Sequence, residues 1–324
     1  MKTRQEAITT RLFAEEPFYF WIDDPVWIED FKDKQEEKSN AKVYTKNDFL
    51  KEVYFSEEQY DQLYYLLKRK QNIIFQGPSG VGKTFSAKRF AYSILGEKDD
   101  TRVKILQFHQ SYSYEDFVIG FRPVKNGFTL KKGPFYEICK QAEQDREHSY
   151  FLLIDEINRG DISKIFGELF TLLEVDKREE KMQILYANEE FLIPKNLYII
   201  GMMNTADRSI AVLDYALRRR FAFVDFTPAF DSQGFKKYQK EIGDKCFNQV
   251  IQVIKQINEE IKQDELLGSS FQIGHSYFCT KQTVTKEWLE SVIEFEMIPL
   301  LKEYWFEEER KVIEWSKKLR EALV

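Results

Sequence analysis

Residues 72–95 have the sequence NIIFQGPSGVGKTFSAKRFAYSIL, and this stretch decides the fold. Its first part, 72–75, is a short apolar run followed by a Gly/Pro/Ser turn, which is typical of a buried strand. Its last part, 83–95, places the apolar residues near one helical face, and Gly96 follows as a C-terminal stop. Between them, GPSGVGKT (77–84) fits the pattern G-x-x-x-x-G-K-[ST] of a phosphate-binding loop.

Each position of this loop has a physical task. The glycines let successive backbone N–H groups turn toward phosphate oxygens. Lys83 supplies a charge to the β- and γ-phosphates, Thr84 offers a hydroxyl to Mg²⁺, and the helix adds its positive end. The alternative is a Gly-rich turn without function. It is disfavoured because the loop lies between a predicted strand and a predicted helix, as a phosphate-binding loop does. The predicted nucleotide-binding residues are Gly77, Pro78, Ser79, Gly80, Val81, Gly82, Lys83 and Thr84.

Two later strand ends carry polar residues suited to hydrolysis. FLLIDE (151–156) is an apolar strand that ends in two carboxylates, as in a Walker B motif. We expect Asp155 to hold Mg²⁺ with Thr84, and Glu156 to polarise the attacking water. Asn204 follows the strand NLYIIGMM (196–203), which should lie beside the Walker B strand and bring an amide near the γ-phosphate. Taken alone, an Asn after a strand is usually a turn former.

ALRRRF (216–221) places three arginines at the end of a short predicted helix. They complement the negative end of a helix dipole, which is one interpretation. The other is that at least one is an arginine finger that reaches the γ-phosphate of a neighbouring subunit. The residues by themselves leave both interpretations open.

The remaining pattern alternates strands and helices up to Pro228 and is helical afterwards. This alternation predicts an α/β fold with a parallel sheet flanked by helices, followed by a small, mostly helical lid. We therefore divide the chain into an N-terminal extension (1–42), a nucleotide-binding subdomain (43–228) and a lid (229–324). The other predicted elements are strands at 103–108 and 220–226, a hairpin at 121–133 with its turn at Asn126-Gly127, and helices at 162–173, 211–218, 234–266 and 286–321.

Composition limits the classes of function. The net charge of −6 gives no argument for a polyanion partner, so any DNA contact needs a local basic patch. The three scattered cysteines indicate reduced thiols and a cytoplasmic protein. No apolar signal segment or membrane span is expected. The three histidines lack the spacing of a zinc site, so Mg²⁺ is the only metal that we expect.

Three stretches together resemble the McrB family, the AAA+ motor subunits of modification-dependent restriction systems. They are IDEINRGDISKIFGELFTLLE (154–174), GMMNTADRSIAVLDYALRRRF (201–221) and FQIGHSYF (271–278). Within them MNTADRS (203–209) is the most specific motif. The resemblance covers roughly residues 43–321, almost all of the chain.

The resemblance implies a hexameric AAA+ ring that hydrolyses GTP, drives DNA translocation and activates a separate nuclease subunit, McrC. It also implies roles for individual residues. Asn204 matches the sensor 1 position, where AAA+ proteins carry the polar residue that orients the attacking water. Asn158 and Arg159, just after the Walker B motif, are expected either to support the catalytic residues or to lie at a subunit interface. Asp207 and Arg208 belong to the specific motif and are expected at the interface, and Arg219 and Arg220 match the family's trans-acting arginines.

Some features depart from the family or leave alternatives open. Only about forty residues precede the motor where the family carries a DNA-reading domain, and the lid has no evident sensor-2 arginine. Gly274-His275-Ser276 is either a nucleotide contact or a structural turn, and the segment 44–55 is the candidate for approaching the base. A chaperone-like ATPase of the MoxR type, which shares the segment DEINR, is the alternative function. A nucleotide-gated scaffold is disfavoured because Glu156 and Asn204 are present.

Overall fold

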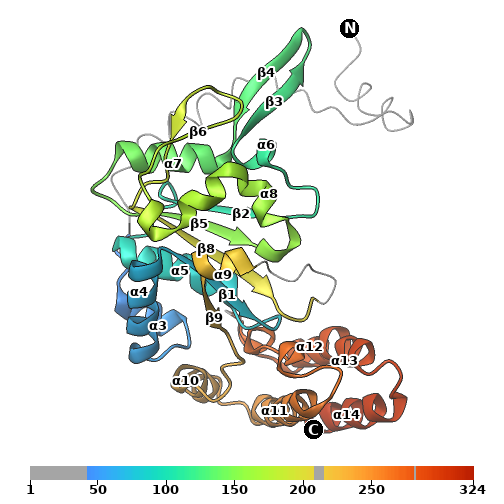
Figure 1. Ribbon diagram of the computed structural model, residues 1–324. Coiled ribbons are helices and arrows are strands. Elements are labelled where there is room, and N and C mark those ends of the chain that lie inside the picture. The colour runs from blue at the N-terminus through green and yellow to red at the C-terminus, as the bar shows by residue number, and fades with distance from the viewer. Residues whose placement is uncertain (1–41, 208–214, 281) are drawn as a thin grey trace, which may run out of the picture. The chain divides into compact units, whose positions relative to one another are not determined.

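The computed structural model describes residues 42–207, 215–280 and 282–324 (Figure 1). The predicted N-terminal extension lies outside the described residues, except for Lys42. None of the helices within these ranges is long and apolar enough to cross a lipid bilayer.

A five-stranded parallel sheet forms the centre of the nucleotide-binding part, in the order β2-β5-β8-β1-β9. This confirms the parallel sheet predicted from the alternating pattern, and β8 pairs with the Walker B strand β5 as expected. The strands are β1 (Asn72–Gly77), β2 (Val103–Gln107), β5 (Tyr150–Asp155), β8 (Leu197–Asn204) and β9 (Ala222–Asp225).

Helices cover both faces of the sheet. Because successive side chains of a strand point to opposite sides, each central strand contributes to two apolar clusters. In β1, Ile74 packs into one apolar cluster, while Ile73 and Phe75 pack into another. Helices α3 (Lys46–Glu52), α4 (Glu57–Lys70) and α5 (Lys83–Leu95) cover the second of these faces. The first is covered by α6 (Tyr114–Phe117), α7 (Pro134–Gln144), α8 (Ile162–Phe166) and the 3₁₀ turn Gly167–Leu173.

The strand register brings the predicted site residues to one edge. Gly77 at the end of β1 is opposite Asn204 at the end of β8, and Ile154, just before Asp155, is opposite Gly201. Because parallel strands all end at the same side of a sheet, the phosphate loop, the Walker B carboxylates and Asn204 meet there.

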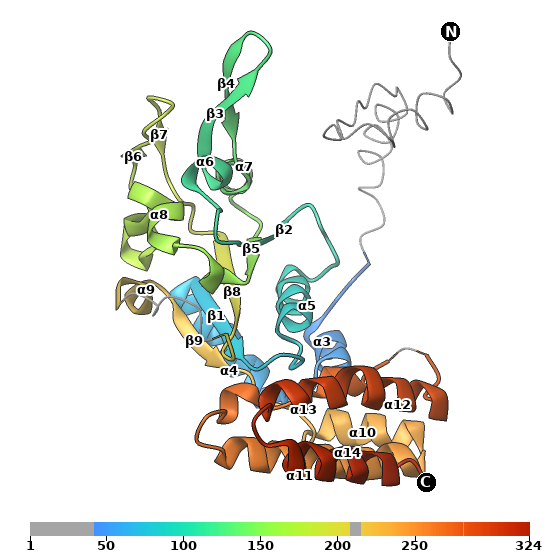
Figure 2. The same ribbon diagram turned by 90° about the vertical axis from the view of Figure 1, so that its right-hand side faces the viewer.

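The C-terminal helices build a core of their own, which runs from Phe230 to Leu323. They lie together as one group in both views (Figures 1 and 2). Their bounds are α10 (Gln233–Ile242), α11 (Lys245–Gln263), α12 (Lys286–Val292), a π-helical turn (Ile293–Met297), α13 (Ile298–Tyr304) and α14 (Glu309–Glu321).

Several predicted elements differ from those observed. The helix predicted over 162–173 stops at Phe166, because Gly167 has a φ of +54° and packs against Tyr114. The helix predicted over 234–266 breaks at Gly243, where Asp244 caps a new helix. Of the short helix predicted over 211–218, the part 211–214 lies outside the described residues, and α9 spans Tyr215–Arg220.

The predicted hairpin is present but is shifted by one residue. It joins β3 (Ile119–Val124) to β4 (Gly127–Lys132) in a two-stranded sheet that is separate from the central one. Val124 pairs with Gly127, so the turn residues are Lys125 and Asn126 instead of Asn126 and Gly127. A second small hairpin pairs β6 (Met182–Gln183) with β7 (Glu190–Phe191).

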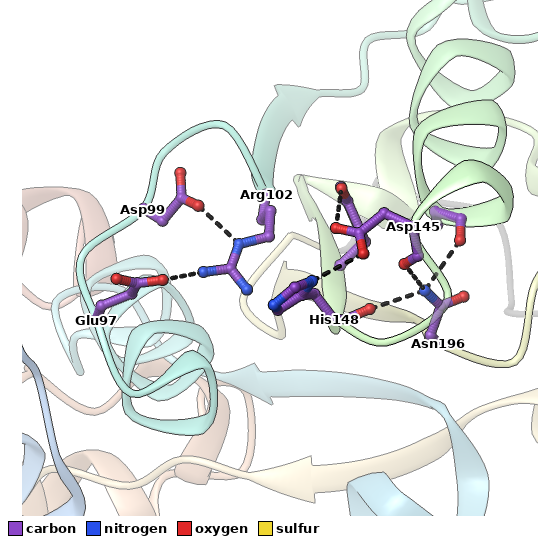
Figure 3. Close-up of polar contacts among 8 residues, drawn as sticks. Glu97, Asp99, Arg102, Asp145, His148 and Asn196 are labelled. Atoms are coloured by element: carbon purple, nitrogen blue, oxygen red, sulfur yellow. Dashed lines mark hydrogen bonds and ion pairs between the residues drawn. The ribbon is translucent and has the colours of Figure 1, made fainter. Parts of the chain in front are cut away.

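Polar contacts link the connections that precede β5 and β8, at the amino ends of these strands and so at the edge opposite the predicted site (Figure 3). The Asn196 amide donates to the carbonyl oxygens of Ala142, Asp145 and His148 at 2.8–3.0 Å. The His148 ring contacts the Asp145 carboxylate at 2.7 Å, which lowers the pKa of Asp145. The Asn196 contacts satisfy backbone carbonyl groups of the connection before β5, so we assign them a structural role.

Candidate functional site

The phosphate-binding loop joins the end of β1 to the start of α5. Gly80 and Gly82 have φ values of +73° and +77°, a region that residues with a side chain rarely adopt. Lys83 Nζ donates to the carbonyl oxygens of Gly77, at 2.9 Å, and Pro78, at 2.7 Å. Burial lowers the pKa of Lys83 to about 8, although the carboxylates of Glu156 and Asp155 oppose this shift.

Thr84 and Asp155 form the expected pair of oxygen ligands. The Thr84 hydroxyl donates to Asp155 Oδ2 at 3.0 Å, and the other oxygen of Asp155 accepts from the backbone N–H of Glu156, also at 3.0 Å. A hydroxyl and a carboxylate at this spacing suit Mg²⁺, which prefers oxygen ligands and keeps several of its waters. The residues present therefore fit the metal that the sequence predicts.

Glu156 has an unusual backbone conformation and a charged partner. Its φ of +50° and ψ of +41° are left-handed, which costs a residue with a side chain about 1–3 kcal/mol. Arg159 Nε donates to Glu156 Oε2 at 3.0 Å, and the Nη2 group of Arg159 donates to Asp207 at 3.0 Å. Arg159 thus links the Walker B glutamate to the specific motif, whose Arg208 lies outside the described residues.

A cavity of about 260 Å³ gathers the predicted phosphate-side residues. It is lined by Lys83, Thr84, Asp155, Glu156 and Asn204, with loop glycines, Met203 and one lid residue, Ser276. The Asn204 side-chain oxygen accepts from the N–H of Ala206 at 3.1 Å, which fixes the side-chain amide at the end of β8. A strand-end amide, two carboxylates and a loop lysine therefore surround one space.

The three arginines of α9 differ in their surroundings. Arg220 is enclosed: it pairs with Glu174 at 2.9 Å and donates to the carbonyl oxygens of Phe170 and Ala216. Its side chain is 11% exposed, compared with 79% for Arg219, which lies 3.9 Å from Glu174. Arg218 lies over the Phe223 ring. Arg219 is therefore accessible from solvent, whereas Arg220 is held by Glu174.

The lid contacts the phosphate loop through Gly274 to Tyr277. The N–H of Ser276 donates to Gly80 O at 2.8 Å, and Tyr277 OH lies 3.4 Å from Ser79 Oγ. A Cβ atom on Gly274 would lie 2.0 Å from the backbone of Gly80. The sequence placed this segment near the nucleotide without choosing between a contact and a turn; its contact with the loop was not predictable from local pattern.

A second cavity, of about 590 Å³, is lined in part by Val81 of the phosphate loop. It is lined by residues 53–57 and 59, by Val81 and Ser86, by 225–229 and 231–233, and by His275. Residues 53–55 belong to the segment 44–55, which the sequence suggested could approach a base. The suggestion came from the family resemblance, because the chain before the first helix often approaches the base in AAA+ proteins.

The β3–β4 hairpin and two of the three histidines lie outside these two cavities. Lys132 on the β3–β4 hairpin donates to Tyr136 OH at 2.8 Å, and Phe128 on the same hairpin is 74% exposed. His109 contacts Ser111, and His148 contacts Asp145. Within the described ranges no three His, Cys, Asp or Glu side chains form a further metal-binding group.

Two sequence profiles match the chain. One, described as the McrB α-helical lid domain, matches residues 249–313, and the other, an AAA domain of the dynein-related subfamily, matches residues 72–221. The AAA profile spans the chain from β1 to α9, and the lid profile spans most of the C-terminal helical core.

Two curated relatives come from restriction systems. The chain is 44% identical over 293 residues to the type IV methyl-directed restriction enzyme EcoKMcrB subunit of Escherichia coli K12, covering 87% of this chain and 64% of that relative. It is 26% identical over 250 residues to the type II restriction enzyme BsuMI component YdiS of Bacillus subtilis 168, covering 62% of this chain and 72% of the relative. A solved structure of a putative ATPase from Cytophaga hutchinsonii aligns over 64% of this chain and 66% of its own, at 15% identity with a TM-score of 0.35.

Proposed function

The chain belongs to the McrB family of AAA+ subunits, and we propose that it is the GTP-hydrolysing motor of a restriction system that acts with a McrC-type nuclease subunit. The observation that supports this most directly is the cavity shared by Lys83, Thr84, Asp155, Glu156 and Asn204. The preference for GTP over ATP is the one that the resemblance to the McrB family implies. Family membership does not favour the MoxR-type chaperone alternative.

In the proposed mechanism, the loop residues bind the triphosphate. Lys83 exchanges the carbonyl oxygens of Gly77 and Pro78 for β- and γ-phosphate oxygens, which are stronger acceptors because they are charged. Thr84 and Asp155 hold Mg²⁺, which neutralises charge on the phosphate oxygens when it is bound.

Glu156 and Asn204 act on the attacking water. Arg159 binds one carboxylate oxygen of Glu156, which leaves the other to polarise a water molecule. The Asn204 amide holds the same water without adding a charge that would compete with Glu156. Asp207 adjusts the position of Glu156 through Arg159.

We propose that hydrolysis takes place at subunit interfaces of a hexameric ring. Arg219 and Arg220 then act in trans on the γ-phosphate of a neighbour, with Arg220 leaving Glu174 to do so.

We also propose that the nucleotide-binding subdomain spans residues 43–228 and the lid spans 229–324, because a separate helical core begins at Phe230.

The same proposal covers the cellular role. The chain spans 64% of the length of the E. coli relative, so the partners and activity of that whole protein are carried over only as proposals. We propose a cytoplasmic complex in which the ring translocates DNA and the nuclease subunit cleaves foreign modified DNA, without a membrane partner.

A mixing experiment tests hydrolysis at shared interfaces. Glu156→Gln chains retain the arginines but lack the base, and Arg219→Ala/Arg220→Ala chains have the opposite defect. Each variant alone should be inactive in GTP turnover, with its fold checked by thermal melting. An equal mixture should recover about one quarter of the wild-type rate, because one interface in four joins an intact site to intact arginines. Full inactivity of the mixture would contradict trans action.

A further inference from the structure

The larger cavity has room for the purine base of a nucleotide whose phosphates lie in the smaller cavity. The two cavities share the phosphate loop as lining: Val81 and Ser86 line the larger, and Gly80 and Lys83 line the smaller. A nucleotide whose phosphates occupy the smaller cavity can therefore place its base in the larger. Glu57, Asp225 and Asp231 are among the residues that line that space, and their carboxylates pair with Lys46, Gln76 and Lys255 respectively.

The hydrogen bond that His275 accepts determines the tautomer of its ring. Nδ1 of His275 accepts from the backbone N–H of Ala229 at 3.0 Å. Burial against Tyr54, Phe230 and Phe235 lowers the pKa of His275 to about 4, so the ring is neutral near pH 7. A neutral imidazole has one donor and one acceptor, and the proton must therefore be on Nε2.

The Nε2–H group is available to a ligand. Within residues 42–207, 215–280 and 282–324, it has no hydrogen-bond partner. It lies 4.0 Å from the position that a Cβ atom of Gly82 would occupy, at the start of α5. His275 lines the larger cavity, whereas Gly82 and the adjacent Ser276 line the smaller one. The fixed donor of His275 thus lies at the boundary between the two cavities.

We propose that His275 is a specificity residue whose Nε2–H donates to the 6-oxo group of guanine; this inference rests on the proposed function. Guanine presents O6 and N7 as acceptors along one edge, and N1–H and the 2-amino group as donors along another. Adenine carries an amino group at C6, which would face the His275 donor with a second donor. The carboxylates of Glu57 and Asp225 are suited to the donor edge of guanine.

A purely structural His275 would instead only accept from Ala229 and pack against Tyr54 and Phe230. Two substitutions separate these roles. Asn reproduces the position of Nδ1 and keeps an acceptor for Ala229, but it has no atom at Nε2. Gln reaches the position of Nε2 with an amide donor, but it does not reproduce Nδ1. A structural role predicts greater damage from His275→Gln, and a recognition role predicts greater damage from His275→Asn.

The experiment measures calorimetric affinities of the whole chain for three diphosphates with Mg²⁺. These are GDP, ADP and the diphosphate of 2-aminopurine riboside, which lacks an oxygen at C6. We expect His275→Asn to weaken GDP binding about tenfold, to change binding of the 2-aminopurine analogue by less than about twofold, and to keep the melting temperature. His275→Gln should retain more GDP affinity than His275→Asn.

Equal weakening of GDP and the 2-aminopurine analogue by His275→Asn would overturn the inference, as would unchanged GDP affinity. The wild-type chain tests the proposed function separately. If it binds ADP as tightly as GDP, the guanine preference of the proposed function fails, and the comparison of GDP with the 2-aminopurine analogue still decides the role of His275.

Discussion

The contact between the lid and the phosphate loop can be tested by adding one methyl group at Gly274. A Cβ there would lie 2.0 Å from Gly80 C and O and 2.5 Å from Ser79 O. All three are backbone atoms, so the strain cannot be relieved by turning a side chain. Because Cβ atoms keep at least 3.0 Å from other heavy atoms, the two segments must separate by about 1 Å.

This separation should break the 2.8 Å hydrogen bond from Ser276 N–H to Gly80 O. Overpacking costs about 1–3 kcal/mol, and the lost hydrogen bond adds about 1 kcal/mol. The displaced segment carries Ser276 and His275, which line the two cavities. We therefore expect Gly274→Ala to weaken GDP binding by about tenfold or more, measured by calorimetry with Mg²⁺.

The matched control is Ser269→Ala, an exposed position on the same lid connection. It should leave GDP affinity and melting temperature unchanged. Gly274→Ala with wild-type affinity and wild-type melting would refute the reasoning, because it would mean that the lid does not rest on the loop. Unchanged affinity with lowered melting would mean that the contact stabilises the fold without shaping the nucleotide site.

Three further predictions concern charged groups. Arg178 is buried and donates to the carbonyl oxygens of Pro194 and Leu197, so Arg178→Ala should lower the free energy of unfolding in urea by about 3 kcal/mol, and a loss below about 1 kcal/mol would contradict this. Arg220→Ala should lower the melting temperature by several degrees while Arg219→Ala should not, because only Arg220 is enclosed; equal effects would contradict that distinction. His275 titrates at about 4 in the folded chain and at its ordinary 6.5 when unfolded, so its stabilisation is complete above pH 6.5 and is lost as the pH falls toward 4. Between pH 7 and pH 5 this loss should be roughly 1–2 kcal/mol in urea unfolding and absent in His275→Asn, and an equal loss in both proteins would exclude His275 as its source.

Local pattern was enough to predict the nucleotide-binding half of the fold. The strand before Gly77, the helix after Gly82 and the carboxylates at Asp155 and Glu156 each follow from a few adjacent residues. The meeting of these ends follows from a general property of parallel sheets, so the position of Asn204 beside them was predictable as well.

The features that the sequence did not reveal depend on contacts between distant residues. Arg159 and Asp207 are 48 residues apart, and Gly80 and Ser276 meet across almost 200 positions. The partner of Arg220 is Glu174, at the end of a 3₁₀ turn that was predicted as continuous helix. Pairings of this kind depend on tertiary packing, which helical and strand periodicity do not encode.

The most direct test of the proposed function is phosphate release from the purified chain with GTP and with ATP, each with Mg²⁺, beside a Glu156→Gln control. The account predicts turnover that prefers GTP and that falls by at least about a hundredfold in the control, because the water loses its base. Turnover that prefers ATP, or that survives Glu156→Gln, would contradict it.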